Sequence, residues 1–455
     1  MLSAILFLYH SLRQSARNSF NHQKLGKRHV SSYNQLSMEN NQQQHPHFAE
    51  ALKVPDIRLF IGSVGFFSLA SRALAVVIGF QIYRLTHSAL ALGWLGLIEA
   101  IPTLSLVLIG GYVADHFNRR RILLITRAAS FLCACALAWL SLENNAHSLI
   151  GLYGVIFLTG IARGFADPAN TAFEAQVVPK HLTVNAASWI SSTFISCSVI
   201  GPAGIGFIFE ALGATGSYAV IAAGFLLSLI FTFFITPRPQ PVPETKEPLL
   251  QSIGTGWRFV WKNQPLLSAM SLDLLAVLFG GMIALLPIYA DDILHVGARG
   301  LGLMNAAPSL GAVIITLLAT RRPPIARAGR NLLLTVAGFG ASTILFAFSR
   351  NFWLSMGLLF LTGVFDGISM VIRRSMVRLL SPDHLRGRIA AANWLFICSS
   401  NELGAWESGM VAAWLGTIPC VAVGGVLTLA VAAVVTLAAP QLRRLRFDTR
   451  TLEQK

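Results

Sequence analysis

With 455 residues, 54% of them hydrophobic and only 12% charged, and a mean hydropathy of +0.61, the chain lies outside the composition range of water-soluble globular domains. Its formal net charge of +15 does not indicate a nucleic-acid surface, because 30 of the 35 Lys and Arg residues fall in alternate predicted loops. Only Arg84, Arg299 and Arg350 lie in the opposite loops. We therefore predict a membrane protein with both termini in the cytoplasm and no nucleic-acid partner.

The first residues are not expected to cross the membrane. The apolar run after Met1 is only about eight residues long, which is too short for a span, and it lacks the basic leader of a signal peptide. We predict that residues 1–54 form a disordered cytoplasmic tail. Met38 is followed by an ordinary cytoplasmic leader, so residues 1–37 are either a disordered extension or a start-codon artefact.

Apolar runs of about 20 residues, the length needed to cross the membrane, recur along the rest of the chain. They are too long and too evenly apolar for barrel strands, so the spans should be helices that satisfy their own backbone hydrogen bonds. We predict an all-α membrane protein with twelve transmembrane helices at 58–84, 93–114, 122–142, 148–168, 185–210, 216–236, 265–290, 300–320, 331–349, 352–372, 389–412 and 417–438.

The two halves of the chain repeat each other. The segment GLIEAIPTL at 96–104 matches GLMNAAPSL at 302–310 with an offset of 206, and PKHL at Pro179 recurs as PDHL at Pro382 with an offset of 203. One copy holds six helices, an even number, so both copies cross the membrane in the same direction. We predict six-helix bundles at 55–236 and 265–438, a Pro-rich cytoplasmic linker at 237–264 and a cytoplasmic tail at 439–455.

A charged motif interrupts the apolar sequence between the second and third predicted helices. Its residues have the spacing G-x-x-x-D-x-x-G-R-R/K, in which an Asn replaces the second Gly: Gly111, Asp115, Asn118 and Arg119–Arg121. Asn tolerates the left-handed turn expected at that place. Together with twelve spans in two parallel copies, this motif resembles the major facilitator superfamily.

The resemblance implies a cytoplasmic gate formed by Gly111, Asp115, Arg119 and Arg120. In such a gate Asp115 caps the next helix or pairs with an arginine of a neighbouring helix, and closes the cytoplasmic side in one state. A basic loop that only holds the topology is the alternative interpretation.

The fifth predicted helix contains a second motif. Gly201, Pro202 and Gly206 match the signature G-x-x-x-G-P-x-x-G-G of the antiporter branch of that superfamily, although Cys197 and Ile205 replace two of its glycines. Small residues permit close helix contact and a proline bends a helix, so a pure packing role is the alternative. The pieces LRGR and SNELG, at 385–388 and 400–404, resemble the branch that contains the enterobactin exporter and related efflux proteins.

Charged residues inside the membrane are costly, which makes them functional candidates. We predict that six of them take part in proton coupling or line a substrate cavity: Arg72, Glu99, Arg163, Asp273, Asp366 and Glu402. Arg163 and Asp366 are 203 residues apart, so they occupy equivalent repeat positions with opposite charges and are expected to face each other across the pseudo-twofold axis. Pairing between helices without a role in transport is the alternative for each.

The remaining features exclude other classes. The chain has no Walker loop, no catalytic triad and no metal-ligand spacing, so we predict no enzyme activity, no cofactor and no metal. The resemblance implies a secondary transporter of the inner membrane that exports a siderophore or a similar amphipathic molecule by proton antiport with alternating access. Macrolide or multidrug efflux and siderophore uptake are the alternatives. The expected partners are the substrate, protons and membrane lipid, and we expect a functional monomer.

Overall fold

The computed structural model describes residues 50–142, 146–239, 257–321, 326–382 and 385–447. The predicted extension 1–37 and residues 240–256 of the predicted linker lie outside these residues. The chain divides into two units, Met1–Lys53 and Val54–Lys455. Of the first unit, the structure describes the short helix α2 (Glu50–Lys53). All other described elements belong to the second unit.

The described part of the second unit is almost entirely helical, and no strand occurs in it. In chain order its elements are α3 (Pro55–Thr86), α4 (Ala89–His116), α5 (Arg119–Leu140), α6 (Ala146–Val177), η1 (Lys180–Leu182), α7 (Thr183–Phe234), α9 (Gln264–Phe279), η2 (Met282–Leu285), α10 (Leu286–Ile288), η3 (Tyr289–Ile293), α11 (Gly297–Arg321), α12 (Ala328–Phe348), α13 (Phe352–Leu380), α14 (Arg386–Leu415), α15 (Thr417–Ala438) and α16 (Pro440–Arg444). Within these ranges ten helical segments are long and apolar enough to cross a membrane. The all-α membrane fold is therefore confirmed.

The ten segments are consistent with the twelve predicted spans. Helix α7 holds the fifth and sixth spans, because Gly213 breaks it with φ of 69° and ψ of −169°, a conformation that glycine adopts readily. Helix α14 corresponds to the eleventh span, although it is not among the ten apolar segments. The exact number of crossings stays a prediction.

The seventh predicted helix, 265–290, is not continuous. Helix α9 ends at Phe279, and the chain continues through a 3-10 turn, the short α10 and the π-helix η3. Two consecutive glycines, Gly280 and Gly281, follow α9, and Pro287 cannot donate a backbone hydrogen bond. The backbone of α14 at Gly404 also approaches Gly281 so closely that a Cβ there would lie 2.7 Å from its carbonyl oxygen.

Polar side chains begin four of the long helices. Each accepts a hydrogen bond from a backbone N–H of the first turn, which otherwise has no partner: Ser88 for α4, Asn118 for α5, Asn263 for α9 and Asn351 for α13. The prediction of a left-handed turn at Asn118 was wrong, because its φ is −64° and its side chain caps α5 through the N–H of Arg121 at 3.2 Å. Asp115 does not serve as that cap.

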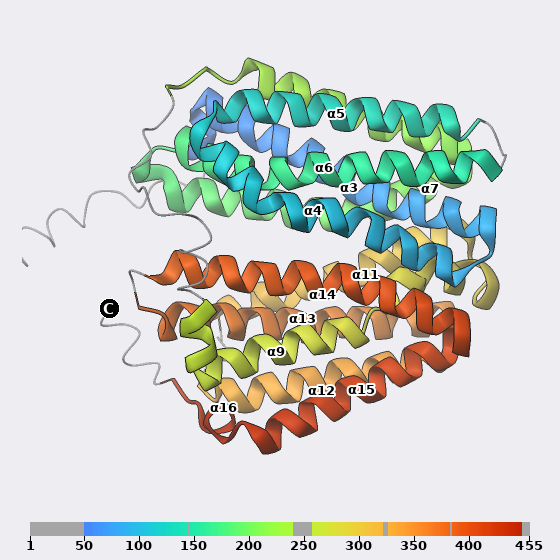
Figure 1. The fold of residues 1–455 in the computed structure, drawn as a ribbon, viewed down its shortest axis with the longest axis vertical. Helices are drawn as coiled ribbons and strands as arrows, with labels where there is room; N and C mark the ends of the chain where they lie inside the picture. Colours follow the sequence, from blue (N-terminus) through green and yellow to red (C-terminus); the bar gives the residue numbers. More distant parts are fainter. Residues whose placement is uncertain (1–49, 143–145, 240–256, 322–325, 383–384, 448–455) are drawn as a thin grey trace, which may run out of the picture. The chain divides into compact units, whose positions relative to one another are not determined.

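The internal repeat appears in the packing of equivalent helices. Gly160 of α6 lies against Pro102 of α4, and Gly363 of α13 lies against Pro308 of α11. The two glycines are 203 residues apart and the two prolines 206, as in the sequence repeat. Figure 1 shows α3, α4, α5 and α6 side by side in one group, with α9, α12, α13 and α15 in another.

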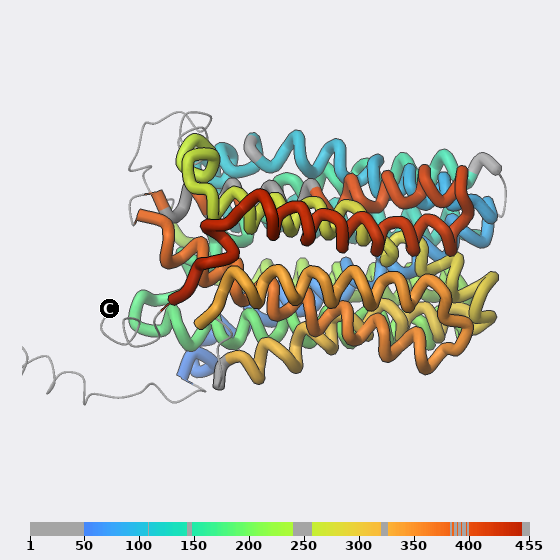
Figure 2. The backbone as a smooth tube through the Cα atoms, turned by 90° about the horizontal axis from the view of Figure 1, so that it is seen from below, coloured from blue at the N-terminus to red at the C-terminus, as the bar shows by residue number. Residues whose placement is uncertain are grey.

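The two groups of helices meet through α4 with α14 and through α7 with α11. At these crossings glycines bring the backbones together: a Cβ on Gly93 would lie 3.1 Å from the Cα of Gly409, and one on Gly206 would lie 3.0 Å from the Cα of Gly302. All four glycines lie towards the ends of the helices that are opposite the Arg-rich loops. Figure 2 shows the long helices running lengthwise between these two ends. We call them the basic end and the glycine end.

Candidate functional site

A cavity of about 1480 Å³ lies between the two groups of helices. Its walls come mainly from α3, α4, α6 and α7 of the first half and from α9, α11, α13 and α14 of the second. The lining extends to Gly111 and Ala172, near the helix ends that carry the Arg-rich loops. The volume exceeds the roughly 300–1,000 Å³ of ordinary small-molecule sites.

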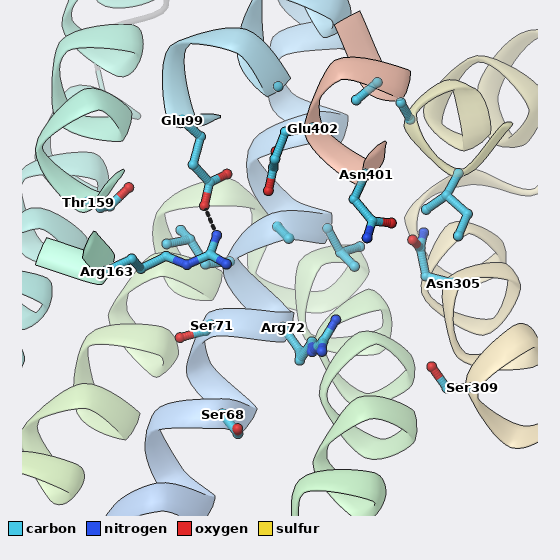
Figure 3. A pocket seen from close by; sticks show the side chains of 18 of the residues that line it. Ser68, Ser71, Arg72, Glu99, Thr159, Arg163, Asn305, Ser309, Asn401 and Glu402 are labelled. Atoms are coloured by element: carbon cyan, nitrogen blue, oxygen red, sulfur yellow. Dashed lines mark hydrogen bonds and ion pairs between the residues drawn. The ribbon is translucent and has the colours of Figure 1, made fainter. Parts of the chain in front are cut away.

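An ion pair lies in the cavity wall. The guanidinium of Arg163, on α6, donates a hydrogen bond to the carboxylate of Glu99, on α4. Their side chains are 38% and 25% exposed, so the pair is accessible from the cavity. Glu402 of α14 points towards the same pair from the second half (Figure 3) and interacts electrostatically with Arg163. Arg163 thus pairs with Glu99, the carboxylate of Glu402 lies nearby, and both halves contribute to the cluster.

Arg72 adds a second cation to the cavity. It lies on α3 with its guanidinium carbon 5.3 Å from the ring centre of Phe194, and it makes no ion pair with any described residue. Asn305 and Asn401 line the facing wall (Figure 3). The cavity therefore offers hydrogen-bond donors and acceptors beside aromatic surface, which suits an amphipathic ligand.

Arg163 and Asp366 each form an ion pair within their own half rather than with each other. Arg163 bonds Glu99 within the first half, whereas Asp366 lies 3.9 Å from Arg373 within the second. Arg373 also forms a close ion pair with Asp273, and both of these side chains are only 8% exposed. Asp366 lines the cavity and is 50% exposed, while Asp273 is not among the lining residues.

The sequence analysis missed a buried cation in the first half. Arg127 was counted with the loop arginines, but it lies within α5 and is 1% exposed. It donates to Thr232 at 3.2 Å and to Asn170 at 3.3 Å, and its guanidinium lies 4.3 Å from the ring centre of Phe67. Its position one to two turns inside an apolar helix was the available signal.

The internal repeat relates the buried residues around Arg127 in the first half to those around Arg373 in the second. Phe67 corresponds to Asp273 at the offset of 206, and Asn170 corresponds to Arg373 at the offset of 203. The first half therefore holds its buried cation on α5, and the second half holds it on α13. Arg373 was also counted as a loop residue, although it follows Asp366 by seven residues and so shares a helix face with it.

The structure places the predicted gate residues at the basic end, where the hydrogen bonds of Arg119 and Arg120 are made within the first half. Arg119 donates to the carbonyls of Ala114 at 3.0 Å and Ala172 at 3.1 Å, and Arg120 donates to the carbonyl of Phe233. Asp115 is 54% exposed and lies 3.7 Å from Arg119, one turn away. Gly111 lines the cavity with no atom within 4 Å of the place a Cβ would occupy. Their role as a gate stays a prediction.

The glycines of the second motif have packing contacts. A Cβ on Gly201 would lie 3.1 Å from the carbonyl oxygen of Leu69 in α3, and Gly206 faces Gly302 of α11. The carbonyl oxygen of Pro202 lies 2.5 Å from the place a Cβ on Gly302 would occupy. The motif thus lets α7 approach one helix of each half. Its link to antiport stays a prediction.

Polar contacts that the sequence analysis did not anticipate join the halves at the glycine end. The hydroxyl of Tyr83 donates a hydrogen bond to Asp292, and Arg84 lies 3.6 Å from Asp291. These carboxylates follow the segment LPIY, which repeats the FQIY that precedes Arg84, so the pattern carried a signal. The halves are thus joined by polar contacts at the glycine end, and the cavity lining reaches Gly111 and Ala172 near the basic end.

Comparison with known proteins agrees with this architecture. Residues 60–405 match the family described as the Major Facilitator Superfamily. The chain belongs to the major facilitator superfamily. It is 26% identical over 329 residues to the enterobactin exporter of Shigella flexneri, covering 71% of this chain and 77% of that protein. The similarity to the enterobactin exporter of Escherichia coli O9:H4 has the same identity and coverage over 330 residues.

Solved structures share the fold. A bacterial homologue of the human lysosomal transporter Spinster, in an inward-facing and unoccupied conformation, superposes with a TM-score of 0.69 at 14% identity, covering 89% of this chain and 100% of that one. The peptide transporter POT in complex with sulfate gives a TM-score of 0.68 at 12% identity, covering 86% and 95%. The protein is therefore a multi-pass membrane transporter of the major facilitator superfamily.

Proposed function

We propose that this transporter exports a siderophore or a similar amphipathic small molecule across the bacterial inner membrane in exchange for protons. The main observation behind this proposal is the cavity of about 1480 Å³, whose wall contains Glu99, Arg163 and Glu402 from both halves. If the basic loops lie in the cytoplasm, as the charge bias predicts, the cavity faces the compartment from which an exporter takes its cargo. The similarity to enterobactin exporters supports the substrate class.

The lining supports an acidic or phenolic cargo. Arg72 has no ion-pair partner among the described residues, so it is available for an anionic group of a ligand. Arg163 pairs with Glu99 in the cavity wall and can exchange this carboxylate for an anionic group of the ligand. Phe67, Phe194 and Phe339 supply aromatic surface for the apolar part of such a molecule.

Proton exchange follows from the composition of the cluster. An ionised Glu402 is a strong hydrogen-bond acceptor for phenol or amide groups of the cargo, because charge-assisted hydrogen bonds are the stronger ones. A proton on Glu402 removes that acceptor and also removes one of two nearby negative charges. Cargo and proton then favour different states of the same residue, which is the condition for antiport.

A cellular experiment tests direction and substrate class. Intracellular and extracellular iron chelator are measured in an iron-starved strain that lacks the gene, with and without a plasmid that carries it. We expect the chelator to accumulate inside the deletion strain and to be secreted again on complementation. Loss of uptake of the iron-loaded chelator would instead support import. No change in either quantity would support drug efflux.

A second experiment tests the coupling. In proteoliposomes, Glu402→Gln should abolish substrate accumulation driven by a pH gradient while substrate exchange without a gradient continues. Glu407→Gln is the matched control, since Glu407 lies on the same helix but does not line the cavity. Equal loss of gradient-driven transport in both variants would remove Glu402 from the coupling mechanism.

A further inference from the structure

Five arginines surround a small pocket at the basic end of the second half. The pocket has a volume of about 300 Å³, and its lining consists of Arg327, Arg330, Arg443, Arg444, Leu445 and Arg446. Arg327 and Arg330 lie at the start of α12, and the others lie in or directly after α16. The pocket is therefore formed by segments that are more than 100 residues apart in the chain.

Packing of the backbone holds the two segments together. The N–H of Gly329 donates to the carbonyl of Leu445 at 3.4 Å, and α16 lies so close to Gly329 that a Cβ there would overlap the backbone of Leu442. Leu442 is fully buried in one apolar cluster with Ala328 and Leu332. The fold thus fixes the arginines around the pocket by contacts that do not involve their charged groups.

The charge of the pocket lacks a partner within the described part of the chain. None of the five guanidinium groups forms an ion pair or a hydrogen bond with a described residue, and all five side chains are exposed. Helix α12 also begins here without a side-chain cap, so its first turn adds the partial positive charge of a helix N-terminus. Like charges gathered in this way repel one another, and a bound polyanionic group would relieve that repulsion.

The surroundings of the pocket favour a lipid over a soluble anion. Leu437, one residue from the end of α15, is 81% exposed, and Leu334, in the second turn of α12, is 57% exposed. Both helices are long and apolar enough to cross a membrane, so these side chains are placed to meet acyl chains. Arginines at the end of a span, next to exposed apolar side chains, match the two parts of an anionic phospholipid.

We propose that the pocket formed by Arg327, Arg330, Arg443, Arg444 and Arg446 binds the phosphate headgroup of an anionic membrane lipid. The guanidinium groups contact the phosphate oxygens, and the acyl chains lie along the exposed faces of α12 and α15. The site is separate from the central cavity and does not depend on which substrate the transporter carries.

The test uses the purified full-length protein in a neutral detergent. Phosphatidylglycerol or phosphatidylcholine is titrated in, and the thermal unfolding midpoint and the lipids retained in native mass spectrometry are measured. We expect phosphatidylglycerol to bind and raise the midpoint, and phosphatidylcholine at the same concentration to do neither. The effect should weaken as salt is added, because the contacts are ionic.

A matched pair of double variants locates the site. Arg330→Gln with Arg443→Gln should weaken phosphatidylglycerol binding by roughly tenfold or more, as expected when two charge-assisted contacts are lost. Arg374→Gln with Arg378→Gln removes two exposed arginines of α13 at the same end and should leave binding unchanged. Equal weakening in both double variants would show a diffuse charge effect and overturn the proposal.

Two further measurements test whether the pocket binds something other than a lipid. If inorganic phosphate raised the unfolding midpoint as much as phosphatidylglycerol did, and the lipid added nothing, the ligand would be a soluble anion and the proposal would fail. The carboxylates of Asp448 and Glu453 lie outside the described residues. If phosphatidylglycerol bound only after Asp448→Asn and Glu453→Gln, the chain's own tail would be the occupant, and the proposal would also fail.

Discussion

The hydroxyl of Tyr83 donates a hydrogen bond to the carboxylate of Asp292, which joins the end of α3 in the first half to η3 in the second. The neighbouring Arg84 lies 3.6 Å from Asp291 and repeats the connection. A transporter that alternates access must separate its halves at this end in the other state. These contacts therefore stabilise the state in which the glycine end is closed.

Removing the hydroxyl tests this role directly. A hydrogen bond to a charged group contributes about 1.5–3 kcal/mol, so Tyr83→Phe should raise the population open at the glycine end by about ten- to a hundredfold. The measurement is the alkylation rate of Ala298→Cys, a buried position at the start of α11 that does not line the cavity, in a background without native cysteines.

The repeat supplies the control for this variant. Tyr289 corresponds to Tyr83 at the offset of 206, but its hydroxyl donates to the carbonyl of Ala347 at 3.2 Å within its own half. Tyr289→Phe should therefore leave the alkylation rate unchanged. Equal acceleration by both variants would mean that the Tyr83 contact does not hold the halves together.

Two adjacent glycines of α4 have opposite environments and should respond differently to alanine. A Cβ on Gly110 would meet the backbone of α6 at Gly164 and Phe165, so Gly110→Ala should lower stability by about 1–3 kcal/mol. A Cβ on Gly111 would meet nothing within 4 Å, so Gly111→Ala should change stability by less than about 0.5 kcal/mol.

A transport measurement shows whether Gly111 belongs to the gate or is an ordinary exposed position. If the cavity closes over Gly111 in the other state, as the predicted gate requires, then Gly111→Ala should slow transport although the protein stays folded. The thermal unfolding midpoint and the transport rate are measured on the same preparation. A wild-type rate for Gly111→Ala would exclude this glycine from the gate.

Asp115 offers a second test of the gate. Its pairing with Arg119 is exposed and spans one turn, so it should contribute only about 0.3–0.5 kcal/mol to stability. Asp115→Asn should therefore leave the unfolding midpoint nearly unchanged. If Asp115 lowers the barrier of the gating step by about 1.4 kcal/mol, its loss should slow transport by roughly tenfold. Arg119→Gln removes two backbone hydrogen bonds as well and should lower both quantities.

Removing one partner of the buried Asp273–Arg373 pair should lower the stability of the protein, whereas removing both partners should not. Arg373→Met leaves the Asp273 carboxylate buried without its cation and should cost about 3–5 kcal/mol, whereas Asp273→Leu combined with Arg373→Met should be close to neutral. Asp366 is half exposed to the cavity and can be hydrated in both variants. A double variant as unstable as Arg373→Met would show that the two charges do not stabilise each other.

Much of the architecture was predictable because it depends on properties that run along the chain. Hydrophobic length places the spans, the alternation of Lys and Arg predicts the orientation, and the 203 and 206 offsets relate the two halves. The break after α9 was less accessible, since Gly280 and Gly281 are tolerated in a spanning helix unless a neighbour approaches them.

For the charged residues of the cavity, the sequence predicted which residues take part but not how they pair. Glu99, Arg163, Asp366 and Glu402 were singled out because charges inside spans are rare, and all four line the cavity. Their partners could not be inferred in the same way, because a repeat offset relates equivalent positions and does not say which side chains touch. Arg163 thus pairs with Glu99 beside it rather than with its counterpart Asp366.

The amino-acid sequence by itself determined the class of protein, the family, the order of the spans and the residues whose charge needs compensation. Only the tertiary structure decided which charges compensate one another, where Arg127 and Arg373 are buried, and that polar contacts join the halves beside Tyr83. The physical reason is that the hydrophobicity and the charge of a segment can be added up along the chain without knowing how the helices pack. Pairing depends instead on the rotation and crossing of helices, which contacts such as Gly206 with Gly302 set in three dimensions.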